Sequence, residues 1–151
     1  MNIEIFDQDD GRVIIRIPVH IRPKGSGAPM LARGSRRPII VWDPPDYKKL
    51  ATAVRKALIA AWGERPAIDA PVRYSATYVF LRPKTNRTHY PLAQGDLSKL
   101  MRRVEDWLAG NRAEPGPVLA NDNLIVETGL HRKLWGEEEG VTVTLMLLEA
   151  L

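Results

Sequence analysis

The sequence predicts a single α+β domain in which a mixed or antiparallel sheet packs against two main helices. Three observations predict it: apolar and polar residues alternate over 72–81, an apolar stripe at helical spacing covers 96–109, and further short strand-like segments surround two helices. A chain of 151 residues with 44% hydrophobic residues can bury one core, and it contains no internal repeat and no long linker. Residues 1–151 are therefore expected to form one domain.

Five segments have the composition and periodicity of strands. They cover residues 12–19, 38–42, 72–81, 124–128 and 141–148. The segment 72–81 is the most regular, because every second residue from Val72 to Phe80 is apolar or aromatic and would face one side of the sheet. Several of these strands lie close enough in the chain to pair antiparallel.

Two segments are predicted to be helices. The first begins at Asp43-Pro44-Pro45-Asp46, where an aspartate can cap and a proline suits the first helical position, and it ends at Gly63. The second runs from about Asp96 to Ala109 and ends at Gly110. Its apolar stripe consists of Leu97, Leu100, Met101, Val104, Trp107 and Leu108. Loops cover residues 82–91 and 111–117, so the expected order of elements is ββαβαββ.

The charge distribution points toward a polyanionic partner. The net charge is +4, and residues 12–37 hold seven basic side chains and no acidic one. Residues 82–103 hold six basic side chains against the single acid Asp96. Clustered Lys and Arg attract nucleic-acid phosphates, because neutralising them releases condensed counterions; a solvated basic surface without a partner is the competing interpretation. The absence of cysteine, of a signal-like N-terminus and of a long apolar run predicts a cytoplasmic protein without a membrane span.

Several common kinds of catalytic site find no support in the sequence. The three histidines, at 20, 89 and 131, share no helical spacing, which argues against a zinc cluster. No glycine-rich phosphate loop joins a strand to a helix, and no serine lies in a nucleophile-elbow motif. The remaining chemistry is that of carboxylates in basic surroundings.

Two aspartates are the main candidates for that chemistry. Asp96 stands at a predicted helix start and Asp122 immediately precedes a predicted strand, so the two can converge if helix and strand pack together. Magnesium commonly takes one or two carboxylates together with waters and substrate phosphate, and Mn²⁺ is the alternative ion. The competing structural roles are a helix cap for Asp96, a turn for Asp122, and a surface ion pair between Arg102 and Asp106.

These segments, taken in order, resemble the RusA-type Holliday junction resolvases (crossover junction endodeoxyribonucleases). The first matching block runs from Gly95 to Gly110 and reads GDLSKLMRRVEDWLAG, where the family carries a Pro-Asp-Leu-Asp-Lys-Leu-type helix start. The second runs from Val118 to Glu127 and reads VLANDNLIVE, where the family carries an Asp-Asp-x-Gln-Val-Val-type segment. The similarity covers most of the chain and is specific from about Arg82 to Lys133.

The resemblance implies a homodimeric endonuclease that binds four-way DNA junctions and nicks opposed strands with Mg²⁺. By position, Asp96 and Asp122 would be catalytic metal ligands, and Arg102 would assist at the scissile phosphate. Ser98 is a further candidate ligand. The residues expected to contact DNA are Arg82, Lys84, Arg87, Lys99, Arg103, Lys133, Lys24, Arg36 and Arg37. Phages and prophages often encode such proteins, which would place this one in the host cytoplasm.

The sequence departs from the family pattern at two positions. Ser98 stands where the family has the second aspartate of its first block, and Asn121 stands where it has the first aspartate of its second block. Losing a carboxylate should weaken metal affinity. Two alternatives therefore stand beside the nuclease: a RusA-like protein that binds branched DNA but cleaves it weakly or not at all, and a general basic nucleic-acid-binding protein.

Overall fold

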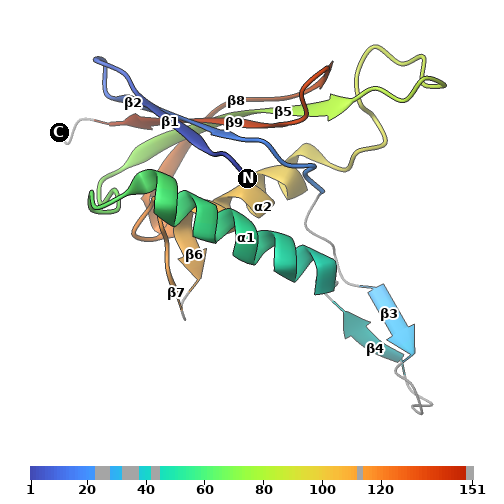
Figure 1. Cartoon of the computed structure of the whole chain (residues 1–151), viewed down its shortest axis with the longest axis horizontal. Helices are drawn as coiled ribbons and strands as arrows, with labels where there is room; N and C mark the ends of the chain where they lie inside the picture. Colours follow the sequence, from blue (N-terminus) through green and yellow to red (C-terminus); the bar gives the residue numbers. More distant parts are fainter. Residues whose placement is uncertain (23–27, 32–37, 42–44, 112–113, 149–151) are drawn as a thin grey trace.

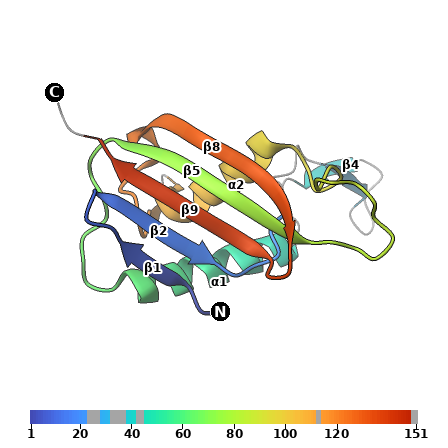
Figure 2. The same cartoon turned by 90° about the horizontal axis from the view of Figure 1, so that it is seen from above.

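The protein has an α+β fold built on a five-stranded mixed sheet. The structure is a computed structural model that describes residues 1–22, 28–31, 38–41, 45–111 and 114–148. The sheet has the order β1-β2-β9-β5-β8, and both long helices lie on one of its faces (Figures 1 and 2). Its strands are β1 (Glu4–Asp7), β2 (Arg12–Ile17), β9 (Gly140–Leu147), β5 (Val72–Leu81) and β8 (Ile125–Gly136).

One parallel pair makes the sheet mixed. Strand β5 pairs antiparallel with β9 and parallel with β8, whereas β1, β2 and β9 pair antiparallel with their neighbours. The connection from β5 to β8 contains the helix α2 (Leu97–Ala109), followed by the short strands β6 (Gly110–Asn111) and β7 (Glu114–Pro115) and the 3₁₀ turn η1 (Asp122–Leu124). A parallel pair needs such a crossover, and this one lays α2 against the sheet.

The core lies between that sheet face and the two helices. Every second residue of β5 from Val72 to Phe80 is buried, as the alternation predicts. The helix α1 (Pro45–Trp62) contributes Val54 and Leu58 to this core, and α2 contributes Leu100 and Val104. All four side chains are fully buried. Burial of these apolar side chains is what holds both helices on the sheet.

Both helices end where glycine makes it possible. Gly63 and Gly110 have φ values of +73° and +69°, a left-handed conformation that favours glycine, and each donates its N–H to a carbonyl of the preceding helical turn. The predicted C-terminal ends of the two helices are therefore confirmed. The proposed start of the first helix at Asp43 and Pro44 lies outside the described residues.

The structure adds strands that the sequence patterns did not indicate. β1 is new and pairs with β2, and β3 (Ala28–Leu31) is new and pairs with β4 (Pro38–Val41), the strand that was predicted over 38–42, in a separate two-stranded sheet. β8 continues to Gly136, eight residues beyond the predicted end of that strand at Thr128. Within the described residues, no helix is both long enough and apolar enough to cross a membrane.

Candidate functional site

Asp96 occupies the N-cap position of α2, but its carboxylate does not cap the helix. Its backbone is extended, with φ −68° and ψ 141°, and its side chain makes no capping hydrogen bond. The side chain is 76% exposed, and its nearest cation is Lys99, whose Nζ lies 3.8 Å from Oδ2. On the other side of the helix start, Lys133 of β8 donates from Nζ to the Gly95 carbonyl over 2.8 Å. The Asp96 carboxylate is thus exposed, with Lys99 beside it and Lys133 bound to the carbonyl of the preceding residue.

The carboxylate of Asp122 likewise takes no part in the turn that contains it. The turn before β8 is held by the neighbouring Asn121, whose side-chain oxygen accepts a hydrogen bond of 2.9 Å from the Asn123 backbone N–H. The Asp122 carboxylate, half-exposed, instead faces α2, where its Oδ2 lies 3.6 Å from Nη1 of Arg102. The structure therefore joins the second of the two sequence blocks to the first.

Arg102 is the centre of a charged group that we call the Arg102 cluster: Arg102, Glu105, Asp106 and Asp122. Arg102 lies 3.4 Å from Glu105 and 3.4 Å from Asp106, so the expected pair with Asp106 forms as one of three contacts. Glu105 is the least exposed of the three carboxylates. Its burial raises the pKa of its carboxyl; Arg102 lowers this pKa, and Asp106 and Asp122 raise it.

A buried hydrogen-bond network, which we call the tyrosine–histidine network, supports α2 from the sheet. The hydroxyls of Tyr74 and Tyr78 lie 3.0 Å apart, and the Tyr78 hydroxyl lies 3.2 Å from Nδ1 of His131. The Tyr74 hydroxyl also donates to the Met101 carbonyl of α2 over 3.3 Å. Burial raises the pKa of both tyrosines and lowers that of His131, so all three groups are kept neutral.

The predicted DNA contacts fall into three groups. Arg82, Lys84 and Arg87 are exposed on the long loop that follows β5 (Figure 2). The second group is Lys99, on the first turn of α2, and Lys133 of β8, which reaches Gly95 just before that turn. Ser98, the candidate metal ligand, is exposed on the same turn. The third group, Lys24, Arg36 and Arg37, lies outside the described residues.

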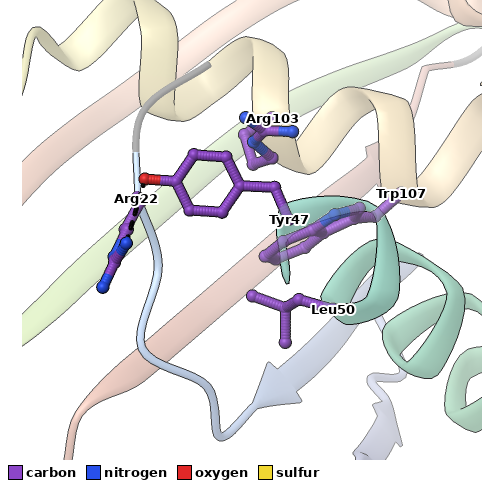
Figure 3. Close-up of a pocket in the computed structure, with 5 residues that line it drawn as sticks. All are labelled: Arg22, Tyr47, Leu50, Arg103 and Trp107. Atoms are coloured by element: carbon purple, nitrogen blue, oxygen red, sulfur yellow. Dashed lines mark hydrogen bonds between the residues drawn. The ribbon is translucent and has the colours of Figure 1, made fainter. Parts of the chain in front are cut away.

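Arg103 differs from the other predicted contacts because it is buried. It is only 6% exposed and points between the helices, where its guanidinium carbon lies 5.3 Å from the ring centroid of Tyr47 (Figure 3). This is a packing position, held by a cation–π contact, rather than an open position for a phosphate. Arg102, the next residue, is half-exposed and meets the carboxylates instead, because consecutive helical positions lie on different faces.

Sequence reasoning missed Glu105 and the tyrosine–histidine network. Glu105 lies three residues after Arg102, a spacing that brings helical side chains together, and this was the available signal. No comparable signal existed for His131, because its place beside Tyr78 depends on the parallel pairing of β8 with β5 and on an irregularity in that pairing.

Comparison with known proteins adds no family assignment to this geometry: no family model and no curated protein sequence matches the chain. Among the residues that the structure describes, no three or more His, Asp or Glu side chains form a group that could hold a metal ion. A metal at this site would accordingly depend on one or two carboxylates, with water and substrate as its other ligands.

Proposed function

We propose that this protein is a magnesium-dependent endonuclease of the RusA type, which acts as a cytoplasmic homodimer and nicks opposed strands of four-way DNA junctions. The observation that carries the proposal is that neither candidate carboxylate serves the local backbone structure, as a helix cap or as a turn residue. Asp96 does not cap its helix, and the turn at Asp122 is made by Asn121. Both carboxylates instead face basic side chains, Lys99 and Arg102, and carboxylates beside cations suit a site that takes a metal ion together with a phosphate.

The residues at α2 are of the kind that a magnesium ion requires. Magnesium prefers oxygen ligands and often takes only one or two protein carboxylates, completing its shell with water and phosphate. Asp96 and Asp122 would be the ligands, with Ser98 as a neutral neighbour; manganese, which also prefers oxygen ligands, is the alternative ion. The bound ion would lower the pKa of a water molecule and offset charge on the cleaved phosphodiester.

Basic residues around the two carboxylates would hold the nucleic acid. Arg102 is half-exposed, so its guanidinium can donate to a phosphate oxygen at the position where it now meets Asp122. Lys99 lies near the Asp96 carboxylate, and Lys133 binds the carbonyl of the preceding residue, Gly95. The exposed loop cations Arg82, Lys84 and Arg87 would contact the DNA backbone further from the cleaved bond, as sequence-independent electrostatic contacts.

The proposal is tested with a labelled four-way junction and a duplex of the same sequence, each incubated with the protein with and without Mg²⁺. We expect paired nicks in the junction that require metal, and little cleavage of the duplex. Asp96→Asn should abolish the nicks and preserve or tighten junction binding, because it removes a metal ligand and a charge that repels phosphate. A junction left uncut by the wild-type protein with either Mg²⁺ or Mn²⁺ would refute the nuclease.

A second candidate is a protein that binds branched DNA without cutting it. Ser98 favours this candidate, because an exposed neutral hydroxyl stands on the first turn of α2 where the family has a carboxylate. Ser98→Asp separates the two candidates. If the protein is a nuclease short of one ligand, this variant should cut junctions faster and at lower Mg²⁺ concentration. An unchanged rate would mean that the site does not use this position.

A further inference from the structure

A groove of about 380 Å³ opens directly beside Asp96. Four segments that are distant in the sequence line it: the residues after β2, the first turn of α1, the end of β5 and the residues that precede α2. The lining residues that matter for recognition are His20, Arg22, Tyr47, Phe80, Gln94 and Gly95. Its volume lies within the range of about 300–1,000 Å³ that is typical of small-ligand sites.

Contacts within the protein hold the walls of this groove in place. Arg22 donates from Nη1 to the Tyr47 hydroxyl over 3.3 Å (Figure 3), and lies 3.8 Å from Asp46. Its guanidinium carbon and that of the buried Arg103 each lie 5.3 Å from the Tyr47 ring centroid. These contacts fix Tyr47 between two cations before any ligand binds.

The lining combines an apolar interior with polar groups at its rim. Phe80 is 2% exposed and lines the groove at the end of β5, so it forms a small apolar part of the floor. The Gln94 amide makes no hydrogen bond within the part of the chain that the structure describes, and it can both donate and accept. His20 uses Nδ1 to bind Glu139 over 2.8 Å, which leaves Nε2 for a ligand. A flat ring with a hydrogen-bonding edge matches this lining.

We propose that the groove binds one unpaired nucleotide of a DNA strand, next to the phosphate that lies at Asp96. This inference rests on the proposed function and specifies its substrate. The base would enter between Phe80 and Gln94, and Arg22 would contact a flanking phosphate. Because Gly95 lines the groove and Asp96 follows it, a nucleotide in the groove places an adjoining phosphate at the start of α2.

A nucleotide can reach this groove only when its base has left the stack. Extrusion from an intact duplex costs the pairing and stacking of that base, and it costs least where the base is already unpaired. The groove therefore favours DNA with unpaired nucleotides at a branch over continuous duplex. Selection of branched substrates would follow from this one site, in addition to the general attraction of the basic surface.

The test uses four-way junctions that each carry one 2-aminopurine, a base whose fluorescence rises when it unstacks, at a different position around the crossover. Binding is followed by anisotropy of a separate label, and all measurements are made without Mg²⁺ so that no cleavage occurs. We expect a several-fold rise in 2-aminopurine fluorescence at one or two positions on binding, and none in the matched duplex. Gln94→Leu should abolish the rise and weaken junction affinity about fivefold, the equivalent of one hydrogen bond.

The chain supplies a matched control in Gln8→Leu, because Gln8 is exposed in the turn before β2, whereas the groove begins at His20, beyond the other end of that strand. It should behave as the wild type, and the melting temperatures of both variants show whether they fold. Two outcomes would refute the nucleotide-binding groove and leave the nuclease proposal standing. One is junction binding without any rise in 2-aminopurine fluorescence. The other is a rise in fluorescence that persists in Gln94→Leu. If 2-aminopurine fluorescence rises on binding but the protein does not cut the junction when Mg²⁺ is added, the groove is supported and the nuclease is contradicted. No binding to any junction overturns both.

Discussion

The two charged regions of α2 differ in how many oppositely charged side chains they contact within the protein. At the N-terminal end, Asp96 is 76% exposed and meets one cation, Lys99, at 3.8 Å. In the middle of the helix, Arg102 meets three carboxylates within 3.6 Å, and the tyrosine–histidine network lies in the sheet beneath that part of the helix. About 9 Å of helix axis separates the Cα positions of Asp96 and Arg102, from six residues at 1.5 Å each.

This difference indicates that the two regions contribute differently to stability, although the sequence places them in one motif. The Arg102 cluster is held by its own internal contacts, so changes there should alter stability as well as activity. The Asp96 region contributes little to its own stability, so changes there should alter ligand binding and leave folding intact. The following substitutions measure that difference, from the largest expected effect to the smallest.

Tyr78→Phe should have the largest effect on stability. It removes the hydroxyl that joins Tyr74 to His131, and leaves partly buried polar atoms without that partner. We expect the free energy of unfolding to fall by about 1–2 kcal/mol, measured by urea denaturation. The matched control is Tyr90→Phe, which changes a side chain that is 60% exposed and should stay within about 0.5 kcal/mol of wild type. Equal effects of the two variants would mean that the network contributes nothing.

Arg102→Met and Lys99→Met compare the two regions on one helix, because each keeps an unbranched chain and removes the charge. The first leaves Glu105, Asp106 and Asp122 without their shared cation, and should lower the free energy of unfolding by about 1 kcal/mol. The second removes one exposed, distant pair and should cost less than about 0.5 kcal/mol. Both values come from metal-free urea denaturation. If Lys99→Met were the more destabilising, the contrast between the regions would be wrong.

Glu105→Gln should have the smallest effect on the free energy of unfolding, and that effect should depend on pH. Because burial raises the folded-state pKa of Glu105, the wild type loses stability as pH rises from the ordinary value of 4.5 through that folded-state pKa. Glutamine does not titrate, so the variant should become more stable relative to wild type across that window and then keep a constant difference. Urea denaturation at several pH values without metal measures it. A difference that does not change with pH would show that Glu105 is not desolvated.

The parts of the fold that depend on local pattern could be predicted from the sequence. The alternation over 72–81 and the stripe over 97–108 arise from one-sided burial, and both elements form where expected. The strand β8 was predicted only as far as Thr128, because its second half contains Gly129, His131, Arg132 and Lys133. These residues form a strand because β5 supplies the hydrogen bonds, which is a long-range effect.

The same distinction applies to the candidate site. The sequence could place Asp96 at the start of α2, because a helix start has a local signature. It could not show that the Asp96 carboxylate is left out of the cap, or that Asn121 rather than Asp122 makes the turn, because these depend on side-chain geometry. The approach of Asp122 to Arg102 also required the crossover that carries η1 to α2.

The most direct test of the central claim, that Asp96 and Asp122 serve one reaction, is the rate of metal-dependent junction cleavage by Asp96→Asn, Asp122→Asn and the double variant. Residues that act as a unit have non-additive effects. Each single variant should therefore lose at least about 100-fold in rate, and the double variant should be no slower than the slower single one. Losses that multiply in the double variant, or full activity in either single one, would contradict a shared site.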